Sequence, residues 1–330
     1  MHVGRRYSLK EFLYWTRRDI YTMTIIAAVP TILYKVLDWH WLALPWVPIA
    51  MVGTAAAFIV GFRNTQTYNR LWEARQIYGS IVNTSRSFGM MVNSFLPKSD
   101  KETRQRFIYR HIAWLTALRF QLREERAWET IKSSISNIEY SQYFTIEEWN
   151  SSLEEELKPF LSEEERVEIL RRKNRATHII HLQSQELRKQ KEIGHIDPLD
   201  YVEIENQLVQ LFEHQGKCER IKNFPYPRQF ATINQMFMRL FASLIPFGML
   251  NEFQKLGDYM VWLTIPFSVV VAWIFLAMEK VGENTENPFE GNANDVPITA
   301  LSRTIEIDLR EMLGETELPP AKQAKNNILT

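Results

Sequence analysis

The chain has 330 residues, with 39 Lys and Arg against 39 Asp and Glu, so its formal net charge is zero. A balanced charge gives no global attraction to nucleic acid or to an acidic partner. The single cysteine, Cys218, excludes an intrachain disulfide and a CxxC zinc site. The mean hydropathy of −0.26 is typical of a soluble protein, but it averages charge-free stretches with a highly charged middle.

Residues 1–19 mix basic and aromatic side chains, among them Arg5, Arg6 and Trp15. This mixture predicts an amphipathic segment at the inner headgroup layer, and the positive-inside rule places the N-terminus in the cytoplasm. An apolar h-region with a small-residue cleavage site does not follow, so we expect no cleaved signal peptide. Residues 20–39 then predict a first membrane span, which together with the second makes up residues 20–62.

The second span is predicted over residues 41–62, a stretch of 22 residues without a charge. An α-helix rises about 1.5 Å per residue, so this stretch is long enough to cross a hydrocarbon layer of about 30 Å. Thr54, Phe58 and Phe62 recur every four residues and therefore share one stripe of the helix. Periodicity alone also fits phenylalanines that face lipid or pack in a core.

Residues 63–232 predict a cytosolic helical region, because charges occur on most turns and alternating strand patterns are missing. Capping-box spacings at Ser99, Thr145 and Ser162 predict that helices start there. An Asp-Pro pair opens residues 197–220, where we expect a long amphipathic helix.

Residues 233–279 predict the third and fourth spans, over 237–253 and 259–278. Basic residues precede the third span, so it begins inside, and four spans leave both termini in the cytoplasm. Residues 280–313 are expected to return to the cytosol and pack on the helical region. The tail at 314–330 has few apolar residues and two prolines, which predicts disorder.

The chain lacks the sequence patterns of the common catalytic and cofactor sites. His178 and His181 have the spacing of two metal ligands on one helix face, but no third ligand accompanies them. The motifs of P-loops, serine hydrolases, zinc proteases and dinucleotide-binding folds are missing. We therefore expect no enzyme, no cofactor and no metal site.

Two separated motifs carry a resemblance to a known family. Residues 61–75 resemble the signature that follows the second membrane helix of bestrophins, the pentameric ion channels. Residues 286–291, 294–298 and 303–306 resemble the segment after that family's last membrane helix, in the same order and with similar separation. The resemblance covers roughly residues 1–315, and it is closer to the bacterial members than to the animal ones.

The resemblance implies an all-α protein with four transmembrane helices and a large cytosolic helical region, assembled as a homopentamer around a central pore. Its place would be the bacterial inner membrane, with both termini cytoplasmic. Its partners would be further copies of itself, membrane lipid and permeant monovalent ions, and not nucleic acid. Thr54, Phe58 and Phe62 would form a pore neck and Leu199 a cytosolic aperture. Hydrophobic constrictions of this kind gate by dewetting.

Polar and aromatic residues follow the stripe directly. They fit either an ion-binding vestibule or a helix-packing and hydrogen-bonding junction just below the membrane, and we favour the junction. These residues are Arg63, Asn64, Tyr68, Arg70, Trp72, Glu73 and Arg75.

The second motif departs from the animal pattern. In animal bestrophins the region matching 287–295 holds consecutive acids that bind the gating calcium. Here Asn287 is kept, but residues 291–294 read Gly-Asn-Ala-Asn and only Asp295 remains of the acids. Calcium takes six to eight oxygen ligands and gains much of its affinity from carboxylates. We therefore expect a channel that does not depend on calcium.

Ion selectivity does not follow from a neck without formal charge. Animal bestrophins pass chloride, whereas the bacterial relatives include cation-permeable channels. The outer loops hold Asp38, Glu252 and Asp258 against Lys35 and Lys255, an acidic excess that favours monovalent cations. A chloride channel of the same fold is the alternative. A membrane-anchored scaffold or sensor that conducts nothing is a further alternative, which would explain the large cytosolic region.

Overall fold

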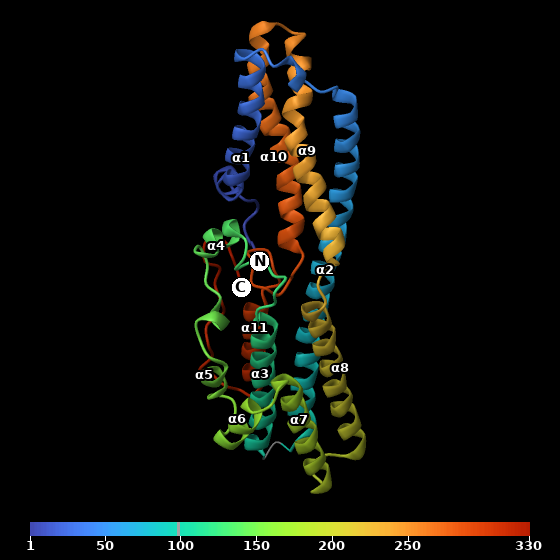
Figure 1. Ribbon diagram of the computed structural model, residues 1–330. Helices are drawn as coiled ribbons and strands as arrows, with labels where there is room; N and C mark the ends of the chain where they lie inside the picture. The colour runs from blue at the N-terminus through green and yellow to red at the C-terminus, as the bar shows by residue number, and fades with distance from the viewer. Residues whose placement is uncertain (98–99) are drawn as a thin grey trace.

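The computed structural model describes residues 1–97 and 100–330, and it is an elongated stack of helices (Figure 1). Within these ranges the backbone forms helices, turns and isolated bridges without a sheet, which confirms the all-α prediction. The helices are α1 (Leu9–Val36), η1 (His40–Leu42), α2 (Trp46–Phe95), α3 (Lys101–Arg123), α4 (Ile135–Ser141), η2 (Glu147–Trp149), α5 (Leu153–Leu157), α6 (Glu163–Leu170), α7 (Arg175–Glu192), α8 (Pro198–Asn223), α9 (Arg228–Gln254), η3 (Asp258–Leu263), α10 (Thr264–Thr285) and α11 (Ile298–Met312).

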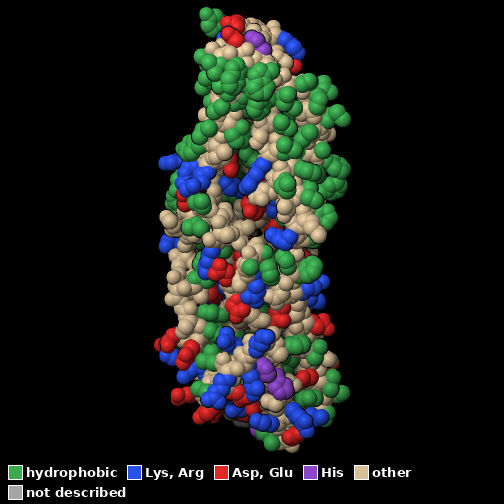
Figure 2. All heavy atoms as spheres, in the orientation of Figure 1, with side chains coloured by type: hydrophobic (Ala, Val, Ile, Leu, Met, Phe, Trp, Pro, Cys, Tyr) green, Lys and Arg blue, Asp and Glu red, His purple; other side chains and the backbone are tan. Residues whose placement is uncertain are grey.

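The upper half of the molecule consists of α1, the first part of α2, α9 and α10. Figure 2 shows its surface dominated by hydrophobic side chains, while charged side chains gather on the lower half. Within the described residues, four helices are long and apolar enough to cross a membrane, as the sequence predicts. The second span begins at Trp46 rather than Trp41, because Pro45 caps α2 and residues 40–42 form a separate turn.

Helix α2 joins the two halves. It runs unbroken for 50 residues, about 75 Å at 1.5 Å per residue. Its buried positions recur every three or four residues, so one face of the helix stays packed along its length. In the upper half and at the boundary these positions are Gly53, Ala56, Val60, Arg63 and Thr67.

The lower half has its own hydrophobic core, formed where α3, α7, α8 and α11 pack around the lower part of α2. Phe88, Phe107 and Trp114 are fully buried there. Burying a side chain of this size contributes roughly 1.5–3 kcal/mol each. The Trp114 indole also donates to the side chain of Gln215 at 2.8 Å, so its polar atom is satisfied.

The predicted helix starts have different outcomes. Ser162 forms a full capping box at the start of α6, and Asp197 caps α8 with Pro198 in the first turn, so both predictions are confirmed. Thr145 does not cap a helix, because the next residue, Ile146, is buried and leads only into the short turn η2. Ser99 lies outside the described residues.

The structure differs from the predicted disorder of residues 314–330. Ile328 is buried in a cluster with Phe144 and Ile146. The backbone of the tail pairs with the N-terminus, with the amide of Val3 donating to the carbonyl of Asn327 at 2.8 Å. The prediction of disorder is wrong here because these partners are distant in sequence and local composition does not reveal them. The two termini consequently lie together near the middle of the molecule (Figure 1).

Candidate functional site

The stripe of Thr54, Phe58 and Phe62 lies on the face of α2 that is turned away from the rest of the chain. The side chains of Phe58 and Phe62 are 68% and 57% exposed. Their ring centroids are 4.5 Å apart at an interplanar angle of 89°, the edge-to-face arrangement that aromatic pairs prefer. The Thr54 hydroxyl donates to the carbonyl of Ala50 at 3.0 Å, and its oxygen still has a lone pair for water.

The opposite face of α2 fixes the orientation of this stripe. Gly53 faces the ring of Phe241 on α9 so closely that a Cβ on Gly53 would come within 2.5 Å of that ring. Ala56 and Val60 continue the same packed face. Small residues at a helix crossing let two backbones approach closely in a membrane. The stripe therefore points outward because the back of α2 is held against α9 and α10.

Directly after Phe62, on the packed face of α2, the buried Arg63 anchors the helix through charge. Its guanidinium donates to Glu279 at 2.8 Å and to Glu286 at 3.1 Å, and Glu286 also pairs with Arg228. A buried charge that loses its partner costs about 3–5 kcal/mol. The sequence identified Arg63 but not its partners. A signal was present, because Glu279 and Glu286 lie seven residues apart, two helical turns, and so share a face.

Asn64 continues the same anchor. Its side-chain amide donates to the carbonyl of Met278 on α10 at 3.1 Å. Gly282 leaves the space that the side-chain oxygen of Asn64 occupies, and a Cβ at this glycine would collide with it. Asn64 is therefore part of the contact between α2 and α10.

Arg70 and Glu73 tie α2 to the end of α8. Arg70 donates to the carbonyl oxygens of Ile221 and Phe224, where the carbonyls of a helix end lack intrahelical partners. Glu73 forms an ion pair with Arg220. A positive group at a helix C-terminus is also favoured by the helix dipole. These contacts support the interpretation of the stretch as a structural junction.

Tyr68 and Trp72 do not take part in that junction. Both side chains are more than half exposed, and their rings stack with centroids 6.5 Å apart and planes 9° apart. Trp72 follows Thr54 by 18 residues, about five full turns of 3.6 residues, so it lies in line with the stripe. Arg75 is half-buried beside them. The exposed aromatic face of α2 therefore extends below the membrane-spanning part.

Leu199 lies in the first turn of α8 and is 77% exposed. The Asp197 carboxylate accepts a hydrogen bond from the Leu199 amide at 2.9 Å, which fixes the start of the helix. Helix α8 runs alongside the lower part of α2 (Figure 1). From the Arg70 contact at Ile221, Leu199 is 22 residues away, roughly 33 Å along the helix.

The segment between α10 and α11 is held by its own hydrogen bonds. The Asp295 carboxylate accepts from the amides of Gly291 at 2.7 Å and Asn292 at 3.0 Å. Glu290 accepts from the amide and the hydroxyl of Thr130 at 2.8 and 2.9 Å. Burial raises the pKa of Glu290 to about 8 and the pKa of Asp295 to about 6.

Two further side chains complete this segment. Asn287 donates to Glu290 at 3.4 Å, and Arg123 donates to the carbonyl of Phe289 at 3.0 Å while lying 4.0 Å from Asp295. Across residues 1–97 and 100–330, no three acidic, His or Cys side chains gather as a metal site. The side chains of Asn287 and Asp295 are thus buried and hydrogen-bonded within the protein.

The loops between α1 and α2 and between α9 and α10 show how their acidic excess is distributed. Lys35 pairs with Asp258, and Lys255 pairs with Glu252 at 2.8 Å. The Asp38 side chain is 83% exposed. Its one described ion-pair partner is His40, at 3.9 Å. Asp38 therefore carries the uncompensated negative charge of these loops.

Comparison with known proteins finds similarity over most of the chain. Residues 15–311 match the family described as bacterial and fungal bestrophin proteins. The voltage-dependent anion channel-forming protein YneE of Escherichia coli (strain K12) is 26% identical over 272 residues, 82% of this chain and 78% of that protein. A voltage-dependent anion channel-forming protein of Ralstonia nicotianae is 26% identical over 296 residues, 88% and 86% of the two chains. The crystal structure of a bestrophin homologue from Klebsiella pneumoniae is similar with a TM-score of 0.77 at 25% identity, covering 91% of this chain and 99% of that one.

Proposed function

The chain belongs to the bacterial and fungal bestrophin family, whose members are ion channels rather than enzymes, and on that premise we propose that it forms a homopentameric channel for monovalent ions. Its place is a bacterial membrane, and we assign it to the inner membrane. Residues 1–19, 63–232 and 280–330 then lie in the cytosol, and residues 20–62 and 233–279 span the bilayer.

The observation that carries this proposal is the outward stripe on α2. Phe58 and Phe62 are exposed although the opposite face of their helix is tightly packed. On a membrane helix such a face lies against lipid, a neighbouring subunit or a pore, and the continuation of the stripe to the exposed Trp72, beyond the apolar stretch, favours the pore. In a ring of five subunits, such a face on each copy of α2 would line a common axis and form the neck.

The neck opposes the passage of ions because its apolar walls do not replace the water molecules around an ion. Two rings of phenylalanines about one turn apart make an apolar section about 6 Å long from Phe58 to Phe62. An ion in that section loses water contacts that the phenyl groups do not replace, so a narrow neck stays closed until it widens. Thr54 adds a hydroxyl one turn above and shortens the dry section. Leu199 would form a second constriction at the cytosolic exit.

The contacts of the termini support a cytosolic location for both. The amide of Val3 pairs with the carbonyl of Asn327 at 2.8 Å, so the two ends of the chain lie on the same side of the membrane. Arg5, Arg6 and Arg18 lie near this end of α1, where the positive-inside rule expects basic residues.

Two features of the chain favour cations, and the names of its relatives favour anions. Asp38 leaves one uncompensated negative charge per subunit on the outer face, and the Trp72 ring in line with the stripe attracts cations through its π face. We therefore propose that the channel prefers monovalent cations. The names of the relatives, anion channel-forming proteins, favour the second candidate, an anion channel of the same fold.

The proposal is tested with purified protein in liposomes loaded with potassium chloride. Dissipation of the gradient, absent from protein-free liposomes, is the expected result, and an intact gradient would favour the scaffold or sensor instead. In a planar bilayer with a tenfold salt gradient, the sign of the reversal potential then separates the cation from the anion channel. Asp38→Asn should shift that potential towards the anion side if the outer charge contributes.

A further inference from the structure

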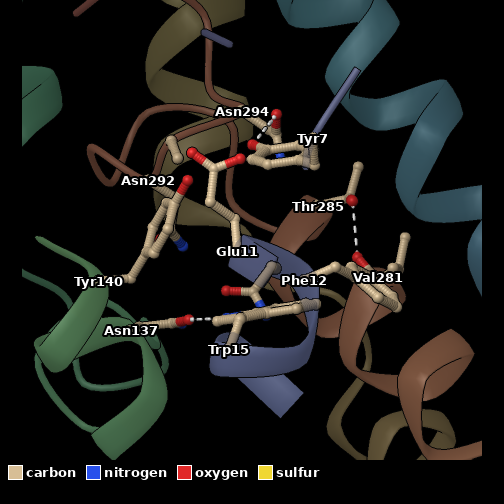
Figure 3. A pocket seen from close by; sticks show the side chains of 12 residues that line it. Tyr7, Glu11, Phe12, Trp15, Asn137, Tyr140, Val281, Thr285, Asn292 and Asn294 are labelled. Carbon is tan, nitrogen blue, oxygen red and sulfur yellow. Dashed lines mark hydrogen bonds between the residues drawn. The ribbon is translucent and has the colours of Figure 1, made fainter. Parts of the chain in front are cut away.

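A cavity of about 220 Å³ lies where the N-terminal segment, α4 and the end of α10 meet (Figure 3). A bound water needs only about 10–15 Å³ by this measure, so the cavity has room for a ligand of several heavy atoms. The described residues that line it come from neither α2 nor α8. The cavity is therefore separate from the candidate ion pathway.

Aromatic rings form much of the cavity wall. Tyr7, Phe12, Trp15 and Tyr140 all line it, and the Phe12 and Trp15 ring centroids are 6.0 Å apart. Figure 3 shows Tyr7, Tyr140 and Trp15 arranged around the side chain of Glu11. The face of an aromatic ring carries partial negative charge, so several faces around one space attract a cation.

The polar groups of the lining also favour positive charge. Glu11 accepts from the amide of Ser8 at 2.8 Å through one carboxylate oxygen, and its side chain lines the cavity. The side-chain amide nitrogens of Asn284 and Asn292 donate into the protein, to the Lys280 carbonyl at 2.8 Å and to Glu290. Their amide oxygens are left as acceptors.

Lys280 lies beside the cavity wall and has hydrogen-bond partners of its own. The Lys280 amine lies 5.3 Å from the Trp15 ring centroid, and it donates to the Trp15 carbonyl at 3.3 Å, to Asp19 at 3.0 Å and to Ser136 at 3.1 Å. Among the described lining residues, Glu11 is the one formally charged group and neither lysine nor arginine occurs.

From these contacts we propose that the cavity binds a small organic cation through its ammonium group. Several aromatic faces and one carboxylate are the surroundings that a primary or quaternary ammonium requires. A hard metal ion fits less well, because it requires six or more oxygens and the walls here are rings. The ammonium belongs either to a soluble amine or to the headgroup of a membrane lipid.

The site joins three parts of the chain that are far apart in sequence. Its walls come from residues 7–15, from 137–140 and from 281–294. A ligand that binds only this folded arrangement stabilises it by mass action. Binding should therefore raise the melting temperature of the purified protein in proportion to the logarithm of ligand concentration.

The experiment compares choline with 3,3-dimethylbutanol, its uncharged isostere, by calorimetric titration of the full-length protein in detergent. Choline should bind about tenfold more tightly or better, the ratio that a desolvated cation–π site gives. Tyr140→Leu and Glu11→Gln should each weaken choline binding about tenfold. Gln at position 11 still completes the capping box of α1. Glu163→Gln, in the first turn of α6, is the matched control and should bind like wild type.

Choline binding in lipid nanodiscs distinguishes the headgroup of a membrane lipid from a soluble amine as the occupant of the cavity. If a lipid headgroup is the occupant, choline should bind more weakly in phosphatidylethanolamine discs than in phosphatidylglycerol discs; if a soluble amine is the occupant, affinity should be equal in the two. Either result supports the site. Equal binding of choline and its isostere, the absence of choline binding in detergent, or wild-type affinity in both Tyr140→Leu and Glu11→Gln would overturn it. Because binding is measured without a current, this outcome is independent of whether the protein conducts.

Discussion

Replacing Phe58 by alanine tests the neck, and its effect can be estimated from the structure. The edge-to-face contact of Phe58 and Phe62, with centroids 4.5 Å apart, is worth about 0.5–1.5 kcal/mol. In the proposed pentamer, five copies would sum to roughly 2.5–7.5 kcal/mol. A tenfold change in the balance of open and closed states needs only about 1.4 kcal/mol. If about half of the smallest sum stabilises the closed state relative to the open state, Phe58→Ala raises the open probability about tenfold.

The variants to record in planar bilayers are Phe58→Ala, Phe62→Ala and the double change, after size-exclusion chromatography has shown intact pentamers. Each single change should raise open probability or conductance substantially, and the double change should give a constant leak. Thr54→Ile should lower conductance, because it lengthens the dry section. Phe267→Ala is the matched control, since Phe267 is 51% exposed on α10 and its ring lies 5.3 Å from that of Phe253. If Phe58→Ala and Phe62→Ala both behave like that control, the phenylalanines do not line a pore.

Leu199→Ala should admit larger ions in a permeability series measured across ions of increasing size, and an unchanged series would remove Leu199 from the pathway. Arg63→Met should lower stability by about 3–5 kcal/mol, seen as a lower melting temperature in detergent, and adding Glu279→Gln should restore part of it; a wild-type melt would contradict the buried pairing. The free energy of unfolding should fall as pH rises from about 6 to about 8, because folded Glu290 keeps a proton that the unfolded chain releases. Glu290→Gln should flatten this dependence, and an equal slope in both proteins would refute it. Open probability should be equal in a calcium chelator and in micromolar calcium, since Asp295 is engaged by backbone amides; steep activation by calcium would contradict this.

The membrane helices were predictable because the bilayer imposes a strong local rule. A span must satisfy its backbone internally and carry about 20 apolar residues, so a charge-free stretch in the sequence is nearly sufficient evidence. The start of α2 was harder to place. Pro45 caps the helix four residues after Trp41, so a window of hydropathy begins too early.

Contacts between distant segments could not be predicted in this way. Arg63 is separated from its partners Glu279 and Glu286 by 216 and 223 residues, and the seven-residue spacing of the two glutamates shows that they share a face but not that they face Arg63. The tail shows the same limit, since Ile328 finds its apolar partners near residues 131–146. The periodicity of the stripe identified which residues share a face, whereas its outward direction depends on the contact of Gly53 with Phe241.

The measurement that tests the central claim most directly is the current through pentamers that carry Phe58→Cys, recorded before and after a membrane-impermeant thiol reagent. The native Cys218 is fully buried, so the engineered thiol is the accessible target. A conducting pore lined by α2 predicts a current that the reagent reduces or abolishes, while Phe267→Cys pentamers keep theirs. A bilayer without current, or a Phe58→Cys current that the reagent leaves unchanged, would contradict the account.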